Sequence, residues 1–428
     1  MPHASISADA PASNDPKSGI HAVPIDFTPL EVVKRLRHLP GMVWMDSALT
    51  QPGQGALSLI TAAPTQILTG HIDKDWNQIS LLLEAAQLPR PTTGPPIPQG
   101  GLFGWVGYDG AYTLGVYPHV LAYDHDAETW HEVGDLLSSS FVQNPALADW
   151  SARLRFTSPV SKRRFISMVS QAREYIASGD IYQVNLACPW TARWPTGAEP
   201  LALYSRLRDV SPSPHAAYLS LAGTQVLSAS PETFLKMDGN KIQTRPIKGT
   251  RPRFLENAFM DTASAAELLA SDKERAELLM ITDLERNDLG KVCRFGSIKV
   301  PELWKIEPFA QVIHLVSTIT GELRPDIDHA SAFRACFPGG SITGAPKKRA
   351  REIIQELEPK PRGLYTGAIG WFGFNGQSQW NIAIRTAIQQ KSRIHFHVGS
   401  GIVADSDPAL EYEETLHKAS GILRAASA

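Results

Sequence analysis

The chain has 428 residues, of which 43% are hydrophobic and 20% are charged, and its formal net charge at pH 7 is -2. This composition is typical of a globular protein, and a nearly neutral chain gives no electrostatic basis for binding nucleic acid or an anionic membrane. No apolar run approaches the ~20 residues that span a bilayer, and the N-terminus lacks the pattern of a signal peptide.

The N-terminal part of the chain divides into a tail and a first region. Residues 1–23 are rich in Ala, Ser, Asp and Pro, which predicts a disordered tail. Residues 24–150 form the first region, and Thr28-Pro29-Leu30-Glu31 has the capping box and early proline of a helix start. Residues 101–108 have glycine at every third position. This spacing does not match the dinucleotide-binding motif, so it predicts a close-packed strand.

Residues 160–426 form the second and larger region. Apolar residues at helical spacing predict a helix over 161–178, and the alternation in 182–186 predicts a half-buried strand. Further helices are expected from Ser271 to about Asp288 and from Asp407-Pro408 onward.

One basic stretch, Thr244 to Arg253, stands out. It holds one lysine, three arginines and two prolines. The prolines keep the backbone extended, and Gly249 permits a sharp turn or the close approach of a ligand. Fixed positive charge suits an anionic substrate and favours the neutral, nucleophilic form of a neighbouring lysine, here Lys248. A solvated basic loop is the alternative interpretation.

The octapeptide Pro246 to Arg253 resembles the P-I-K-G-T-x-P-R signature of aminodeoxychorismate synthase component I, within the family of chorismate-utilising enzymes, and the match continues from about Phe165 to Ala425. The resemblance implies an α+β fold of two facing antiparallel sheet layers flanked by helices, with the active site between the layers. It also implies replacement of the C4 hydroxyl of chorismate by an amino group, as in p-aminobenzoate and folate biosynthesis. Anthranilate synthase component I, which carries alanine at the lysine position, and a non-catalytic chorismate-binding homologue remain alternatives.

The resemblance also assigns roles to individual residues. Lys248 would be a covalent nucleophile at C2, and Glu232 the general acid that protonates the leaving C4 hydroxyl. Arg385 can bind a carboxylate with two hydrogen bonds, and a glycine turn at 399–401 can offer backbone N–H groups to an anion. Taken alone, His314 would more simply be a core histidine. The implied substrate contacts are Gly249, Thr250, His314, Thr343, Tyr365, Arg385, Gly399, Ser400 and Gly401. In relatives that add water to chorismate a lysine occupies the position of Gln183, so the sequence argues against an isochorismate synthase.

Two Glu-x-x-Glu pairs lie on expected helices: Glu274 with Glu277, and Glu411 with Glu414. Residues three apart share one side of a helix, and such a pair is more often a solvated face than a site. The resemblance implies that these four carboxylates hold a magnesium ion that bridges the protein to the substrate carboxylate. Magnesium takes few protein oxygens and keeps water or substrate oxygens as ligands. Which of the four ligate directly stays open.

The three cysteines, Cys188, Cys293 and Cys336, are far apart in the sequence. They form neither a disulfide framework nor a metal-binding motif, so a reducing cytoplasm is the expected compartment. None lies in the G-x-C-x-G turn expected of a glutaminase nucleophile. The expected nitrogen source is therefore a separate glutamine amidotransferase subunit, and free ammonia should replace it.

Overall fold

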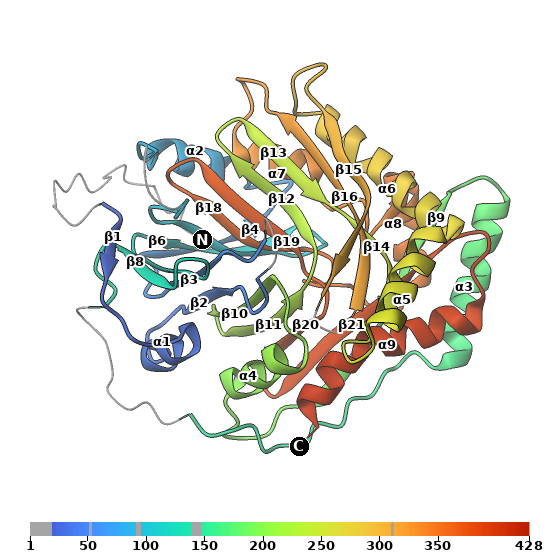
Figure 1. Ribbon diagram of the computed structural model, residues 1–428, viewed down its shortest axis with the longest axis horizontal. Helices are drawn as coiled ribbons and strands as arrows, with labels where there is room; N and C mark the ends of the chain where they lie inside the picture. Colours follow the sequence, from blue (N-terminus) through green and yellow to red (C-terminus); the bar gives the residue numbers. More distant parts are fainter. Residues whose placement is uncertain (1–18, 51–53, 91–95, 138–146, 310–311, 428) are drawn as a thin grey trace, which may run out of the picture.

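The computed structural model describes residues 19–50, 54–90, 96–137, 147–309 and 312–427. Within these ranges, two large antiparallel sheets are flanked by helices (Figure 1), which confirms the expected α+β class. The first sheet has the strand order β1-β8-β7-β3-β2-β10-β11-β20-β21-β9-β17. The second has the order β14-β16-β13-β12-β19-β18-β5-β6-β4, and β15 also pairs with β16.

The strands are β1 His21–Val23, β2 Val43–Asp46, β3 Leu57–Thr61, β4 Gln66–His71, β5 Gly101–Val106, β6 Ala111–Tyr117, β7 Val120–Asp124, β8 Thr129–Val133, β9 Gln183–Arg193, β10 His215–Leu221, β11 Thr224–Ser230, β12 Thr233–Asp238, β13 Lys241–Arg245, β14 Ile247–Pro252, β15 Lys299–Pro308, β16 Val312–Glu322, β17 Gly344–Ala345, β18 Ala368–Gly373, β19 Gln377–Ile382, β20 Thr386–Gln390 and β21 Arg393–Ile402. The helices are α1 Pro29–Leu36, α2 Asn77–Ala85, α3 Lys162–Ala177, α4 Pro200–Val210, α5 Ala258–Ala270, α6 Asp272–Gly290, α7 His329–Cys336, α8 Lys347–Leu357 and α9 Pro408–Ala426.

Both sheets take strands from both regions of the chain. Strands β1–β3, β7 and β8 of the first region join the first sheet, whereas β4–β6 join the second. Regions 24–150 and 160–426 are therefore interleaved rather than separate bodies. The tail expected over 1–23 lies outside the described residues up to 18, and its end was placed too late: His21–Val23 is a strand paired with β8.

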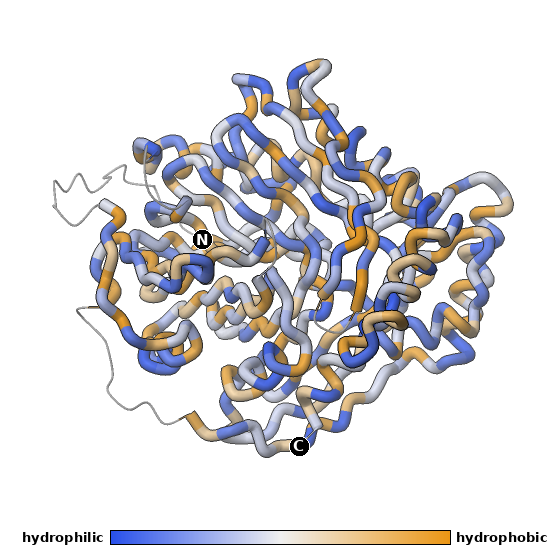
Figure 2. The backbone as a smooth tube through the Cα atoms, viewed as in Figure 1, coloured by the Kyte–Doolittle hydropathy of each residue, from blue (hydrophilic) through white to orange (hydrophobic). Residues whose placement is uncertain are grey.

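Buried hydrophobic residues form a core between the sheets and further cores under the helices. The core between them joins residues of both sheets, such as Leu219 and Trp371. Helices α1, α3, α4, α8 and α9 cover the outer face of the first sheet, while α2 and α7 pack on the second. Helices α5 and α6 pack over β14 and β16. Figure 2 shows how hydrophobic segments alternate with hydrophilic ones along the strands. No helix of the described chain is long and apolar enough to cross a membrane.

Several local sequence signals gave the expected structure. Thr28 caps α1 with a complete capping box to Glu31, and Ser271 caps α6 by accepting from Glu274 N–H. The glycine-rich strand β5 is packed as closely as expected, because a Cβ at Gly104 would lie 2.1 Å from the carbonyl oxygen of Thr113.

Candidate functional site

Glu232 and Arg385 lie where the chain crosses from one sheet to the other. Glu232 stands between β11 of the first sheet and β12 of the second, and Arg385 between β19 of the second and β20 of the first. The two crossings are hydrogen-bonded together: Ile382 N–H donates to the Glu232 carbonyl at 3.0 Å, and Ala229 N–H to that of Arg385 at 3.1 Å. The side chains of Glu232 and Arg385 are thus fixed at the junction of the two sheets.

Lys248 approaches the first sheet from β14, near the edge of the second sheet. A Cβ built on Gly401 of β21 would lie 3.0 Å from both the Lys248 Nζ and the Gln183 Nε2. Both amide atoms of Gln183 are buried without a hydrogen-bond partner in the described chain. A buried polar group normally has a partner, so unpaired atoms beside a lysine indicate a place for a ligand or water.

The glycines at 399 and 401 are not in a turn, and that expectation was wrong. They lie inside β21, paired with Ala187 and Asn185 of β9. Their role is to leave space: a Cβ at Gly399 would lie 2.9 Å from the Tyr365 hydroxyl and the Asn185 Oδ1. Glycine is required here because other groups approach the backbone closely. Ser400 between them is fully buried, and its hydroxyl has no partner among the described residues.

The arginines around Lys248 do not supply free positive charge, which corrects a second expectation. Arg245 pairs with Glu307 and donates to Thr318, and Arg253 pairs with Asp261 at 2.8 Å. Arg251 lies 3.0 Å from Glu267 and 3.6 Å from Glu274. Lys248 itself faces a carboxylate, with its Nζ 3.9 Å from Glu277 Oε2.

Glu232 is suited to hold a proton near neutral pH. Its residue is 5% exposed. Burial raises the pKa of its carboxyl to about 7, although the Ser341 hydroxyl and Lys248 act in the opposite direction. A carboxylic acid that is still partly protonated at pH 7 can protonate a leaving hydroxyl.

Arg385 is a partly buried cation, and its guanidinium has neither a hydrogen bond nor an ion pair within the described ranges. Burial lowers the pKa of Arg385, while the nearby Glu232 raises it. Its backbone φ is +50°, which is uncommon for a residue other than glycine. A desolvated guanidinium held in this way is available for a carboxylate ligand.

His314 of β16 lies on the same side of the site. Its Nδ1 is 3.2 Å from the Gly249 carbonyl oxygen and 3.1 Å from the Thr250 hydroxyl. Burial lowers its pKa to about 3, and Arg385 acts in the same direction. The ring is therefore neutral, and donation from Nδ1 to the Gly249 carbonyl leaves Nε2 as an acceptor. That Nε2 is buried and has no partner in the part of the chain that the structure describes.

The hydroxyls of Thr343 and Tyr365, two further expected substrate contacts, differ in whether the protein already binds them. The hydroxyl of Thr343, a fully buried residue, donates to the carbonyl oxygens of Gly339 and Gly340 at 3.0 and 3.2 Å, so it holds its own loop. Tyr365 stacks on His397 with 5.4 Å between ring centroids. Its hydroxyl points toward Gly399 and the site.

The four glutamates expected to bind metal lie on α6 and α9. Burial raises the pKa of Glu277, Lys248 lowers it, and Glu274 and Glu411 raise it further. For Glu414 burial acts upward, but Lys418 at 2.6 Å prevails and the pKa is lowered. Among the described residues, no three His, Cys, Asp or Glu side chains are grouped closely enough to hold a metal by themselves.

Arg362 and Lys418 are part of the site's architecture, and the sequence patterns did not assign them roles. The buried Arg362 pairs with Glu358 at 2.6 Å and donates to the carbonyl oxygens of Ile342 and Asn185. Lys418 donates to the Gly399 carbonyl at 3.1 Å. The four-residue spacing of Glu358 and Arg362, which both follow the last residue of α8, was the available signal, but it did not indicate that the pair is buried.

Removal of Arg362 should strongly destabilise the fold around the site. Arg362→Ala leaves Glu358 buried without its counter-charge, and such a loss costs about 3–5 kcal/mol. Urea unfolding would measure it. Arg349→Ala is the matched control, because its pair with Asp180 is partly exposed, and it should cost far less. Equal losses in the two variants would contradict the role given to Arg362.

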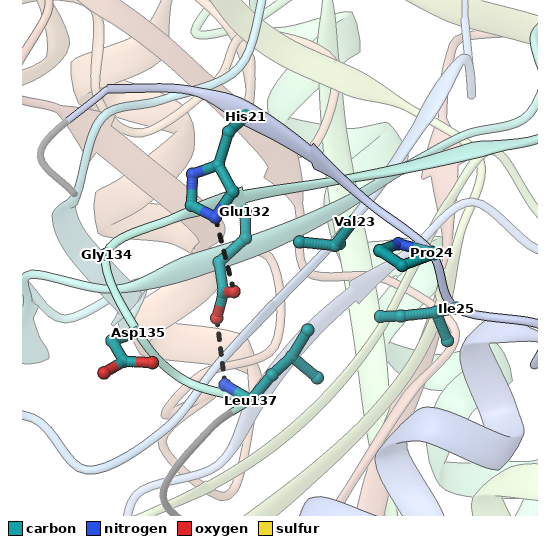
Figure 3. Close-up of a pocket in the computed structure, with 8 residues that line it drawn as sticks. All are labelled: His21, Val23, Pro24, Ile25, Glu132, Gly134, Asp135 and Leu137. Carbon is teal, nitrogen blue, oxygen red and sulfur yellow. Dashed lines mark hydrogen bonds and ion pairs between the residues drawn. The ribbon is translucent and has the colours of Figure 1, made fainter.

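A surface hollow of about 350 Å³ lies elsewhere, around β1 and β8 (Figure 3). It contains the Glu132 carboxylate, which accepts from Leu137 N–H at 2.9 Å and lies 3.8 Å from His21. Strand β1 is the edge of the first sheet opposite β9 and β17, so this hollow is not part of the Lys248 site.

The family model of chorismate binding enzymes matches residues 47–424. The chain therefore belongs to the chorismate binding enzyme family, as the resemblance implied. It is 40% identical over 365 residues to the aminodeoxychorismate synthase component 1 of Bacillus subtilis (strain 168), covering 76% of this chain and 77% of the relative.

Anthranilate synthases are equally similar. An anthranilate synthase component 1 of Haloarcula marismortui is 44% identical over 270 residues, or 63% of this chain and 55% of the relative. The crystal structure of anthranilate synthase component I from Streptococcus pneumoniae TIGR4 superimposes with a TM-score of 0.75 at 30% identity, covering 88% of this chain and 93% of that one. The similarity thus defines the family and the fold, and the position aminated has to be inferred from the site.

Proposed function

We propose that the chain aminates chorismate at C4 to 4-amino-4-deoxychorismate, with ammonia supplied by a glutamine amidotransferase subunit. The observation that carries the proposal is the position of Lys248, a partly buried primary amine among unpaired polar groups, close enough to Glu232 to lower the pKa of its carboxyl. With a nucleophile and an acid in one site, attack of the amine at one ring carbon can expel a protonated hydroxyl from another.

In this mechanism the Lys248 amine gives up a proton and adds to C2, the ring double bonds shift, and the C4–O bond breaks. The hydroxyl takes the proton of Glu232 and leaves as water. Ammonia then adds at C4, the double bonds shift back, and the C2–N bond to Lys248 breaks. The protons lost by the two attacking amines equal those taken up by the hydroxyl and the departing lysine. The free guanidinium of Arg385 and the unpaired Nε2 of His314 would bind and orient the substrate.

The first test is product identity. The purified chain with chorismate, magnesium and ammonia should form 4-amino-4-deoxychorismate without any glutaminase, because its three thiols are buried and it needs no glutamine chemistry of its own. Liquid chromatography with mass spectrometry separates this product from anthranilate. Anthranilate as the main product would instead assign the C2-aminating reaction, and absence of turnover would favour a non-catalytic homologue. Glutamine-dependent turnover by the single chain would contradict the separate-subunit proposal.

The carboxylates on α6 and α9 fit a magnesium ion that shares its coordination with the substrate. Glu411 Oε2 is buried with no partner among the described residues, and Glu277 has two further carboxylates nearby. Carboxylate oxygens placed in this way suit a cation that one or two protein carboxylates hold and other oxygens complete. Glu277 and Glu414 would hold the ion, with Glu274 and Glu411 as further candidates. When bound, it supplies positive charge for the substrate carboxylate.

Glu414→Gln should raise the magnesium concentration needed for half-maximal turnover by about 10-fold or more. The change preserves side-chain size and removes one negative charge, so the fold should be retained. Magnesium titrations of turnover and calorimetry of metal binding would measure the effect. Glu413→Gln is the control, because Glu413 pairs with Lys162 at 2.7 Å away from the site. Full activity of Glu414→Gln at low magnesium would exclude Glu414 as a ligand.

A further inference from the structure

Helix α5 is hydrophobic on its outer face as well as its inner one. On the inner face, Leu268 is fully buried. Opposite Leu268, Phe259 is 80% exposed, and Met260 and Leu269, on the two flanks of the helix, are exposed as well. Figure 2 shows hydrophobic residues along much of this helix. A helix that is apolar on all sides is normally buried on all sides, so its exposure requires an explanation.

The exposed surface extends beyond the helix. Phe254 and Leu255, in the connection from β14, are also exposed. Phe254 N–H donates to Asp261 Oδ1 at 2.9 Å, which holds this connection against the first turn of α5. We call Phe254, Leu255, Phe259, Met260 and Leu269 the α5 patch. Several exposed hydrophobic side chains on one helix and the connection before it indicate an interaction site on a soluble protein.

The charged residues of α5 do not explain why its hydrophobic side chains are exposed. The helix carries two charged residues, Asp261 and Glu267, and both are paired with arginines of β14 and its extension, at 2.8 Å and 3.0 Å. Exposed charges lie beside the hydrophobic side chains, at Glu256 before the helix and at Asp272 at the start of α6, where Asp272 lies 4.0 Å from Arg275. An apolar centre with a polar rim is the composition of a protein–protein interface.

The α5 patch lies over the strand that carries the reactive lysine. Helix α5 packs on β14 and on α6 (Figure 1). A Cβ built on Gly249, the residue after Lys248, would lie 2.7 Å from the Leu268 Cδ1 on the inner face of α5. One helix therefore separates a partner on the patch from the Lys248 strand.

We propose that the α5 patch is the docking surface for the subunit that hydrolyses glutamine. This inference rests on the proposed function, because that reaction consumes ammonia. The chain has no glutaminase nucleophile of its own: Cys188, Cys293 and Cys336 are all buried. Free ammonia is mostly protonated at neutral pH and loses its nucleophilicity, so the site of glutamine hydrolysis should adjoin Lys248. The patch is an uncovered apolar surface next to that strand.

Phe259→Glu and Leu269→Glu test the proposal. A charge placed in an apolar interface should weaken binding by about 30-fold or more. The probe is the purified amidotransferase subunit, from the same cells, that gives the wild-type chain glutamine-dependent turnover. Calorimetry would measure its binding, and turnover would be followed with glutamine and with ammonia. Leu81→Glu on α2, where Leu81 is 66% exposed, is the matched control.

The expected result is loss of binding and of glutamine-dependent turnover in both α5 variants, with ammonia-dependent turnover within twofold of wild type. Unchanged binding would overturn the proposal. So would a wild-type homodimer that Phe259→Glu converts to a monomer, because a second copy would then cover the patch. If no amidotransferase subunit binds while ammonia supports turnover, the docking proposal fails and the amination stands. If ammonia supports no turnover in the wild type, it is the proposed function that fails.

Discussion

Lys248→Ala should reduce formation of the C4-amino product on the order of 10³-fold or more, while chorismate still binds. The loss follows from the position of the Lys248 amine, which lies close to Gly401 and Gln183. No other lysine is among the nearest neighbours of a Cβ built at Gly401. Direct attack of ammonia on C2 would remain open, so the variant is expected to form traces of the C2-amino product. Turnover assays with product separation measure both.

The covalent role of Lys248 has its own signature. Wild-type enzyme held with chorismate and magnesium, without ammonia, should carry a mass increase on the peptide that contains Lys248. Lys273→Ala is the matched control, because Lys273 Nζ lies at the same distance from Glu277, 3.9 Å, and has no role in the proposed chemistry. It should retain turnover and form the adduct. Near-normal C4 amination by Lys248→Ala would refute the covalent role and leave Lys248 as a positioning charge.

Glu232→Gln should slow the loss of the C4 hydroxyl by about 10²–10⁴-fold, the usual contribution of a general acid. The glutamine fills the same space, so substrate binding should change little. Because burial raises the pKa of Glu232 to about 7, its acid form is abundant below pH 7 and is lost as the pH rises above it. The rate of adduct formation without ammonia should therefore decrease above about pH 7 in the wild type, and this decrease should be absent in the variant.

Glu285→Gln is the control for that experiment. Glu285 is a second buried carboxyl whose pKa burial raises to about 8, and Thr244 donates to it. It is not given a role in the reaction, and a glutamine oxygen can accept the same hydrogen bond. It should keep most of the turnover. If Glu285→Gln abolished the decrease above pH 7 and Glu232→Gln retained it, the general acid would have been assigned to the wrong residue.

The sequence predicted what local chemistry determines. Caps at Thr28 and Ser271 placed two helix starts correctly, because a capping side chain bonds to backbone only a few residues away. The segment Gly399 to Gly401 was misread as a turn, because a short G-x-G pattern fits a turn and a crowded strand equally well. What requires glycine there is the approach of Gln183, Tyr365 and Lys248, and such distant contacts follow from sheet pairing.

The site itself was predicted by motif and not by geometry. The sequence brought Glu232 and Lys248 together only through the family resemblance, whereas the structure gives the physical reason: Glu232 marks a crossing between sheets. The positive charges beside Lys248 could not be interpreted without their partners. Glu307, Glu267 and Asp261, which neutralise them, follow in the sequence at separations that carry no local pattern.

Because both sheets combine strands from the two regions of the chain, neither sheet can be completed until late in synthesis. Strand β5 is complete early, but its Val106 pairs with Ala368, 262 positions later in the chain. At about 5–20 residues per second, a ribosome needs roughly 13 to 50 s to make that partner strand. Until then β5 has an open hydrophobic edge, which is a template for wrong pairing. The N-terminal strands are made first but close last, so a nascent chain of this protein depends on protection until β18 has emerged.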